Sequence, residues 1–154
     1  MNNSQKKFLA QYGSTSHIDH IIKELDKHPW SLSHRLAENP FLTNEHVNEL
    51  VKYTENDQPK PGKIRLDNPD LNPKIIDHFL SDPKISGERK LKIAMRRNLQ
   101  PHQVDKLIND ENIGIRGWMI YNANTKKHHL EKLMQDEDPD VRKEAKEVYD
   151  SRYK

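Results

Sequence analysis

A short stretch of sequence occurs four times along this chain with similar spacing of its apolar residues. The copies that begin at Leu36 and Arg65 both contain Asn-Pro, a leucine two residues later and a closing apolar pair. The copies that begin at Ile93 and Met119 keep the closing apolar residues without the Asn-Pro pair. A repeat of this length predicts stacked supersecondary units, each burying its apolar face against its neighbours. The equivalent residues are Val47, Ile76, Val104 and Leu130, which lie 29, 28 and 26 residues apart.

Each copy has the features of a short amphipathic helix. Its apolar residues follow the i, i+3, i+4 spacing that places them on one helical face. Pro73 and Pro101 stand where a first helical residue is expected, a position that does not need a backbone N–H. Asn39-Pro40 and Asn68-Pro69 are expected to end a weaker preceding helix, because proline disfavours helix in the residue before it. The predicted N-caps are Thr43, Asn72, Gln100 and Thr125.

These helices are too short to be stable alone in water, so they are expected to stack. The predicted fold is all-α, a short α-solenoid of helical pairs in a single domain. Residues 55–62 contain two prolines and a glycine and are expected to form an irregular loop. The expected parts are N-terminal cap helices at 1–29, repeats at 30–57, 58–84, 85–111 and 112–138, and a C-terminal cap helix at 139–154.

The chain resembles the leucine-rich repeat variant family of HEAT-like helical repeats over roughly residues 30 to 150. The resemblance rests on the run from Asp136 to Arg142, on Asn-Pro-x-Leu and on the Leu-x-x-Leu that follows it. The family's Val-Arg step is matched at Ile115-Arg116 and Val141-Arg142, keeps only its charge at Arg89-Lys90, and lacks arginine at Leu32-Ser33 and Pro61-Gly62. Similar repeats occur in tailed-phage proteins. The resemblance implies a right-handed superhelix of paired helices and almost nothing specific about activity.

Composition excludes several classes of protein. There is no cysteine, so disulfides, thiolate metal sites, a cysteine nucleophile and the iron–sulfur site of one member of the family are excluded. The longest apolar run, Trp118–Tyr121, is far shorter than the roughly 20 residues of a membrane span. No signal-peptide core follows Lys6 and Lys7, so we expect a cytoplasmic protein, in the host cytoplasm if the chain is phage-encoded. No partnership with a membrane is predicted.

No catalytic or metal-binding constellation is evident. The five glycines are isolated and do not form a phosphate loop. His17 and His20 share a helical face but lack further ligands, and the adjacent His128 and His129 are expected to diverge and to be solvated. The run of acidic residues at 136–140 is interpreted as a water-facing turn. We therefore predict no catalytic residue, no metal and no cofactor.

Positive charge is concentrated in the middle of the chain. Residues 59–97 contain ten basic and five acidic side chains. In a helix over 87–97, the side chains of Arg89, Lys92 and Arg96 would share one face, opposite Leu91, Ala94 and Met95 in the core. Trp118, close to Arg116 in sequence, is a candidate aromatic anchor. The candidate basic stripe consists of Arg65, Arg89, Lys92, Arg96, Arg97 and Arg116.

The first hypothesis is therefore a non-enzymatic module that binds a protein partner through an extended surface. The alternative is a nucleic-acid-binding protein that uses the basic stripe. Neutralising about four phosphates of duplex DNA would give a log–log salt slope of about −3.6. A third alternative is a HEAT-like DNA glycosylase, which would need a carboxylate beside an aromatic pocket on the concave face. The sequence does not indicate an oligomeric state.

Overall fold

The computed structural model describes residues 2–25, 29–53 and 64–154. These residues form α-helices, one short 3-10 helix and no β-strand, which confirms the predicted all-α class. They group into two compact units, which we call unit 1 (Met1–Ser81) and unit 2 (Asp82–Lys154) and describe separately. Unit 1 contains α1 (Asn3–Tyr12), α2 (Thr15–Ile22), α3 (Pro29–Ala37), α4 (Asn44–Leu50), the 3-10 helix η1 (Val51–Tyr53) and α5 (Pro73–Ser81). Unit 2 contains α6 (Gly87–Ala94), α7 (Pro101–Leu107), α8 (Ile113–Tyr121), α9 (Lys127–Leu133) and α10 (Pro139–Tyr153).

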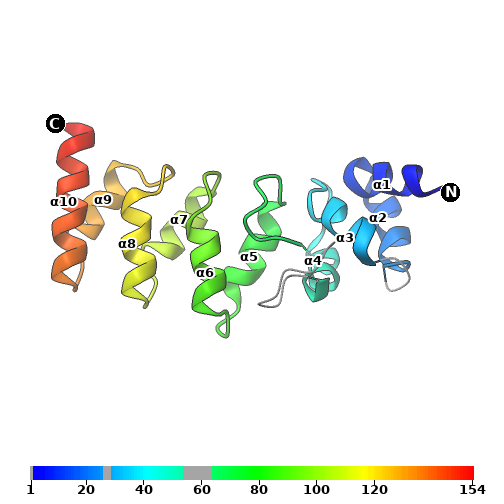
Figure 1. The fold of residues 1–154 in the computed structure, drawn as a ribbon, viewed down its shortest axis with the longest axis horizontal. Helices are drawn as coiled ribbons and strands as arrows, with labels where there is room; N and C mark the ends of the chain where they lie inside the picture. Colours follow the sequence, from blue (N-terminus) through cyan, green and yellow to red (C-terminus); the bar gives the residue numbers. More distant parts are fainter. Residues whose placement is uncertain (1, 26–28, 54–63) are drawn as a thin grey trace. The chain divides into compact units, whose positions relative to one another are not determined.

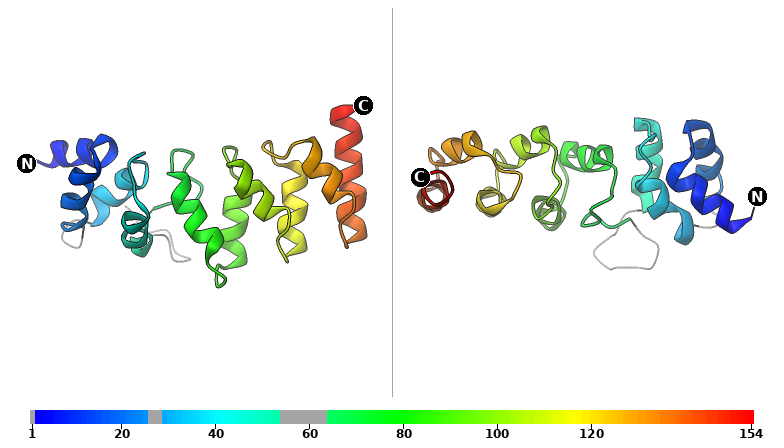
Figure 2. Two further views of the ribbon diagram at one scale, coloured as in Figure 1. Left: turned by 180° about the vertical axis from the view of Figure 1, so that it is seen from behind. Right: turned by 90° about the horizontal axis from the view of Figure 1, so that it is seen from above.

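The helices of unit 2 lie in two layers (Figures 1 and 2). α6, α8 and α10 lie side by side in one layer, and α7 and α9 form the other. Apolar side chains from both layers meet between them and form the core of the unit. The fully or almost fully buried ones include Ile93, Val104, Leu107, Met119, Ile120, Leu130, Leu133 and Ala145.

Unit 1 buries a comparable set of side chains between its helices. α1 packs against α2 and α3, and α4 packs against α2, α3 and α5. Ile18, Leu36, Leu50 and Ile75 are completely enclosed. The prediction that Val47 and Ile76 in this unit, and Val104 and Leu130 in unit 2, point into an interior is confirmed.

The helices begin largely where the capping residues predicted. Thr43 precedes α4, and its hydroxyl accepts a hydrogen bond from the His46 backbone N–H (3.3 Å). The side chain of Asn72 accepts one from the backbone N–H of the second residue of α5 (2.9 Å). Gln100 precedes α7 as predicted. The prediction for Thr125 is wrong: α9 begins one residue later, and the Thr125 hydroxyl instead donates to the Met119 carbonyl oxygen (2.6 Å).

Two asparagines end helices and also connect them to the preceding helix pair. The Asn39 side-chain amide donates to the carbonyl oxygens of Ala10 (2.9 Å) and Gly13 (3.0 Å). Asn122 makes the same contact in unit 2, where its amide donates to the carbonyl oxygens of Ala94 (2.6 Å) and Arg96 (2.8 Å). Each amide oxygen accepts from the backbone N–H two residues on, at 2.8 Å. Free carbonyl groups at helix ends are thereby satisfied without water.

The structure differs from the sequence prediction at the end of α6. The helix ends at Ala94 rather than at Arg97, so the side chains that follow leave the predicted stripe. Met95, expected in the core, is 56% exposed, and Arg96, expected in solvent, is 6% exposed. The predicted irregular loop at 55–62 lies outside the described residues. Within the described part of the chain, no helix has both the length and the apolar character needed to cross a bilayer.

Candidate protein-binding surface

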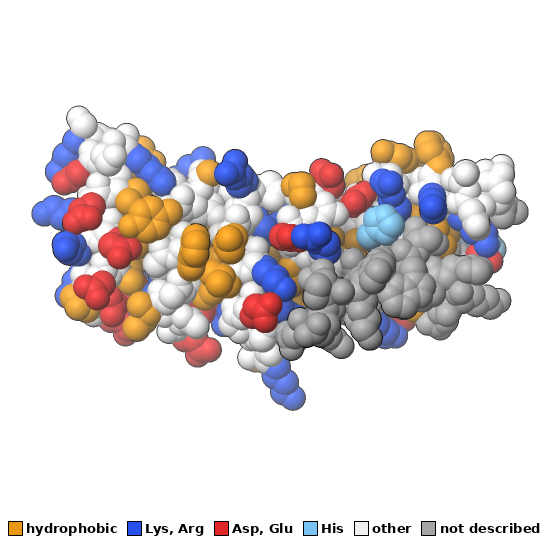
Figure 3. Space-filling model, in the orientation of Figure 1, with side chains coloured by type: hydrophobic (Ala, Val, Ile, Leu, Met, Phe, Trp, Pro, Cys, Tyr) orange, Lys and Arg blue, Asp and Glu red, His pale blue; other side chains and the backbone are white. Residues whose placement is uncertain are grey.

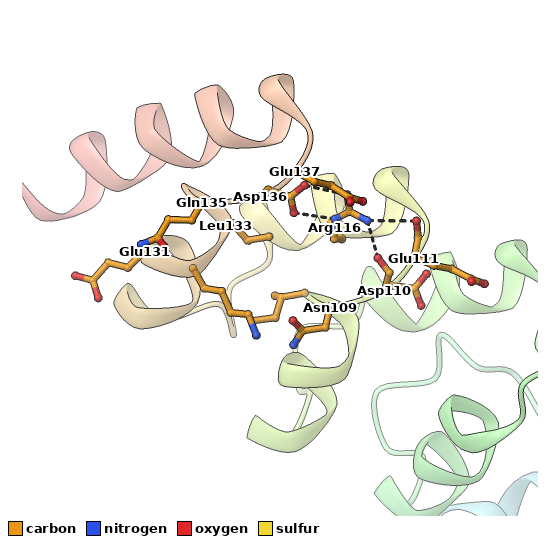
Figure 4. A pocket seen from close by; sticks show the side chains of 11 residues that line it. Asn109, Asp110, Glu111, Arg116, Glu131, Leu133, Gln135, Asp136 and Glu137 are labelled. Carbon is orange, nitrogen blue, oxygen red and sulfur yellow. Dashed lines mark hydrogen bonds and ion pairs between the residues drawn. The ribbon is translucent and has the colours of Figure 1, made fainter.

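Arg116, a predicted member of the basic stripe, is a buried structural residue. It lines a hollow of about 660 Å³ between the loop before α8, the end of α9 and the loop before α10 (Figure 4). Its Nε and Nη2 each bond a carboxylate oxygen of Asp136 at 2.8 Å, and its Nη1 donates to the carbonyl oxygens of Asp110 (2.8 Å) and Glu111 (3.2 Å). The hydrogen bond with Asp136 raises the pKa of Arg116 above its usual value. These contacts use most of the guanidinium donors, so little remains for an external ligand.

The same arrangement recurs in the neighbouring loops. Arg142 Nη1 donates to the carbonyl oxygens of Asp136 (2.7 Å) and Glu137 (2.9 Å), as Arg116 does one loop earlier. Lys90 Nζ lies 2.8 Å from a carboxylate oxygen of Asp110. Burial would raise the pKa of Asp136, but its hydrogen bond from the arginine holds that pKa below the usual value. The basic residues at the positions of the Val-Arg step, Lys90, Arg116 and Arg142, thus bond loop residues of unit 2.

The other residues of the predicted stripe differ in exposure and belong to both units. Arg96 is buried, so the expectation that it faces solvent beside Arg89 and Lys92 is wrong. Arg89 and Lys92 are half-buried on α6, and the Lys92 ammonium lies 3.0 Å from a Glu88 carboxylate oxygen. Arg97 is exposed in the turn that follows. Arg65 belongs to unit 1, where its guanidinium pairs with the carboxylate two residues later (2.8 Å).

One cluster of possible metal ligands occurs in unit 2. Ligand atoms of Asp105, His128 and His129 all lie within 4.8 Å of one another. The two imidazole centroids are 3.8 Å apart, so the prediction that these rings diverge is wrong, and His129 is buried rather than solvated. His129 Nδ1 accepts the Lys126 backbone N–H (2.9 Å), which leaves the proton of the neutral ring on Nε2, 3.2 Å from Asp105. A metal bound to Nε2 would shift the proton of the neutral ring to Nδ1. Nδ1 could then no longer accept the Lys126 backbone N–H, and the cap of α9 would be lost.

An equivalent histidine contact in unit 1 indicates a packing role. His46 Nδ1 accepts the Thr43 backbone N–H (3.1 Å), and its Nε2 lies 2.7 Å from an Asp19 carboxylate oxygen. Gln103 fills the corresponding place in α7 and accepts the Gln100 backbone N–H at 3.0 Å. These buried side chains cap the start of a helix, and both histidines also contact the preceding short helix. We therefore interpret the Asp105 cluster as such a contact.

The exposed side of α8 is unusually apolar for a surface helix. Ile113, Trp118 and Tyr121 are 50%, 48% and 56% exposed. Ile113, Gly117 and Tyr121 follow each other at i, i+4 and i+8, with Trp118 adjacent, so these residues form one stripe. A groove of about 300 Å³ runs along it, lined by Gly114, Gly117, Trp118, Tyr121 and Glu144. Figure 3 shows hydrophobic side chains gathered over α8 and toward α6.

Gly117 has no role in the internal packing of unit 2. Apart from the backbone of α8 itself and the two neighbouring residues, a Cβ atom built on it would meet no heavy atom within 4 Å. Glycine within a helix is less stable than alanine by about 1 kcal/mol, and no internal contact offsets that loss here. Gly114 differs, because its added Cβ would lie 3.1 Å from the Asn112 side-chain oxygen, which caps α8. The opposite side of α8 is buried through Ile115, Met119 and Ile120.

Acidic residues of α10 stand beside this stripe. The Tyr121 hydroxyl donates to a Glu144 carboxylate oxygen at 3.2 Å. Partial desolvation of the phenol, followed by the nearby Glu144 charge, raises the pKa of Tyr121, so the phenol stays protonated and remains a donor at neutral pH. Asp140, Glu144 and Glu147 follow one another at i, i+4 and i+7 on α10. Figure 3 shows acidic side chains over α10, next to the hydrophobic ones of α8.

We call the stripe of Ile113, Gly117, Trp118 and Tyr121, together with Glu144, the α8 surface. The sequence identified Trp118 as a candidate anchor but placed it with Arg116, which faces the other way. Ile113, Gly117 and Tyr121 were missed. The sequence signal that could have identified them is that residues 113–121 carry apolar side chains on both helical faces. A helix that buries only one face needs apolar side chains on that face alone.

No family model matches the chain, and no curated protein or solved structure matches it either.

Proposed function

We propose that the protein is a non-enzymatic protein-interaction module built as a short α-solenoid of HEAT-like helical pairs. The recurring contacts support the solenoid. Asn39 and Asn122 each bond carbonyl oxygens of the preceding helix pair. His46 in α4 contacts Asp19 of α2, and His129 in α9 contacts Asp105 of α7, so each reaches the second helix of the preceding pair. Repetition of the same bonds between successive pairs is expected when similar units stack in one direction.

The α8 surface is the observation that carries the binding proposal. Monomeric proteins scatter single apolar side chains over their surface, whereas a contiguous set beside polar residues typically marks a contact site. Tryptophan and tyrosine are also the residues that most often dominate binding energy at interfaces. A non-enzymatic role is supported by the clustered titratable groups of unit 2, which are occupied in helix-to-helix and loop contacts.

The direct test is site-specific crosslinking in cells of the source organism. A photoreactive phenylalanine analogue is placed at Trp118 and, as a control, at Phe41, which is 55% exposed in unit 1. We expect crosslinks to a discrete partner from Trp118 only. The purified partner should then bind Trp118→Ala about 30-fold more weakly than the original chain, as expected for a hot-spot residue, and Phe41→Ala within about twofold. Equal crosslinking from both positions would contradict the proposal.

The nucleic-acid alternative now depends on fewer side chains. With Arg96 and Arg116 buried, unit 2 offers Arg89, Lys92 and Arg97. Three phosphate contacts would give a salt slope of about −2.7. Retention of duplex DNA at about 50 mM salt, lost on reversing these three charges, would favour this alternative over protein binding.

A further inference from the structure

We propose that the α8 surface binds an amphipathic, basic helix of a partner protein, with an aliphatic side chain above Gly117 and a Lys or Arg side chain at Glu144. This inference rests on the proposed protein-binding function and adds the chemistry of the partner. Three observations support it: the groove over Gly117, the acidic side chains of α10, and the similar lengths of the apolar stripe on α8 and of the row of acidic side chains on α10.

The groove suits an inserted side chain. Its floor is Gly117, and no atom of the chain lies where a Cβ would stand, so a partner side chain can reach the backbone of α8. Trp118 and Tyr121 line the groove with Gly117 and are about half exposed. Such a site favours an aliphatic side chain, because burial beside aromatic rings removes apolar area from water without leaving a polar group unpaired.

The charge beside the groove favours a cationic partner. Glu144 lines the groove itself, and Asp140 and Glu147 lie one turn away from it on the same side of α10. Arg152 also contacts α8, but its guanidinium donates to the carbonyl oxygens of Tyr121 at the end of that helix (3.4 Å) and of Thr125 in the loop that follows (3.5 Å). A partner with acidic residues would meet like charges here, whereas Lys or Arg would pair with them.

The dimensions favour a helix. Ile113 to Tyr121 covers the nine residues of α8, whose ends are about 12 Å apart, and Asp140 to Glu147 spans about 10 Å of α10. The two helices lie side by side (Figures 1 and 2). Two turns of an amphipathic helix present apolar residues at i, i+4 and i+7 over the same length, with basic residues on an adjoining face.

The test uses a phage-displayed library of random peptides of about 16 residues, long enough for four helical turns, selected on the full chain. Enriched peptides are synthesised, and their affinities are measured by fluorescence anisotropy. We expect aliphatic residues at helical spacing, together with an excess of Lys and Arg. Affinity should fall at least about tenfold for Gly117→Leu, which fills the groove, and for Glu144→Lys, which reverses its charge.

The controls separate binding from folding. Gly117→Leu should raise Tm by a few degrees, since leucine is the better helix former, so loss of binding would not reflect unfolding. Gly87→Leu adds the same side chain at the start of α6, where an added Cβ meets only Asn112 Nδ2 at 3.8 Å. Asp70→Lys makes the same charge change at an exposed site of unit 1. Both should bind within about twofold of the original chain.

The outcomes distinguish this inference from the proposed function. Peptides that depend on Gly117 but carry no excess of basic residues, or bind Glu144→Lys equally well, overturn the partner chemistry and leave protein binding intact. Failure to enrich any peptide that is sensitive to Gly117→Leu overturns both. Selection of acidic peptides by a Glu144→Lys, Glu147→Lys double variant would support the charge complementarity directly.

Discussion

Units 1 and 2 connect their helices with similar amide contacts but differ in their use of buried charge. Asn39 in unit 1 and Asn122 in unit 2 each bond two carbonyl oxygens of the preceding helix pair. Unit 2 adds the buried pair of Arg116 with Asp136, whereas Ser33, which is completely buried, stands at the corresponding place in α3. The difference shows that packing a helix pair does not require an ion pair at this position.

The largest effect is expected from removing Arg116. Arg116→Ala leaves Asp136 buried without its partner and two loop carbonyls without donors, so the free energy of unfolding should fall by about 3–5 kcal/mol. Urea denaturation measures this loss. Ser33→Ala should cost no more than about 1–2 kcal/mol, because the residue that it replaces is neutral. Equal losses at the two positions would contradict the contrast between the units.

The asparagine contacts should be equally important in both units. Asn39→Ala removes the amide donor from the carbonyl oxygens of Ala10 and Gly13, and Asn122→Ala removes it from those of Ala94 and Arg96. Each variant should lower the free energy of unfolding by about 2 kcal/mol. Exposed Asn48→Ala in α4 serves as the control and should change stability by less than about 0.5 kcal/mol. If only one of the two buried asparagines mattered, the shared role of these contacts would be wrong.

Stability should fall at mildly acidic pH. Burial, and secondarily the charge of His128, lowers the pKa of His129 below 6.5, and burial likewise lowers the pKa of His34 in unit 1. Below about pH 6.5 the unfolded chain therefore binds protons at these histidines more readily than the folded chain does. Their contribution to the free energy of unfolding is fully present above about pH 7 and is lost as the pH falls from 6.5 toward the pKa of the folded state. Each histidine contributes at most about 1.4 kcal/mol per pH unit.

His129→Gln tests the role of this histidine. Glutamine fills the corresponding place in α7, where Gln103 accepts the N-cap backbone N–H. The variant should therefore keep the cap and lose part of the decline, while the part due to His34 remains. Thermal denaturation between pH 5 and pH 8 measures the difference. An unchanged pH profile in the variant would show that His129 does not titrate in this range.

A smaller change of either sign is expected at the glycines. Gly117→Ala should stabilise unit 2 by about 1 kcal/mol, because its Cβ meets nothing. Gly13→Ala in unit 1 should instead be destabilising by at least about 1 kcal/mol, because its Cβ would clash with the Leu9 carbonyl oxygen. Thermal denaturation of the two variants gives both signs. A loss of stability in Gly117→Ala would mean that this glycine has a packing role.

The smallest effect is expected on the surface of α6. Lys92→Ala removes an i, i+4 pair with Glu88 that is partly exposed, so it should change stability by no more than about 0.5 kcal/mol. Arg96→Ala, four residues further on but buried, should lower stability by more than about 1 kcal/mol. If the two variants lost similar amounts of stability, Arg96 would instead face solvent, as the sequence predicted.

Several elements of the fold were predictable from local patterns. Pro73 and Pro101 marked the first residues of α5 and α7, and Asn39 marked the end of α3. The positions of Val47, Ile76, Val104 and Leu130 identified the buried faces. The errors at Met95 and Arg96 have one cause: α6 ends at Ala94, and beyond that residue helical periodicity no longer describes which side chains face inward.

The candidate site was less predictable, because it depends on which of two apolar faces of α8 is covered. Trp118 was recognised as a potential anchor, but helical spacing alone assigns no difference in burial between Ile113 and Ile115. The predicted partner of Trp118 was Arg116, whose position beside Asp136 brings together residues 20 apart in sequence. No pattern within a single helix contains that information.

Spacing and capping along this chain were sufficient for its all-helical class, the start of most helices and the inward-facing residues, because these depend on interactions within one or two turns. The use of Arg116, His129 and Asn122 as connections between helices, and the exposure of one apolar side of α8, depend on which surfaces meet after folding. Burial of a charged side chain is stable only when a particular partner lies within bonding distance, and that distance is a property of the packed helices.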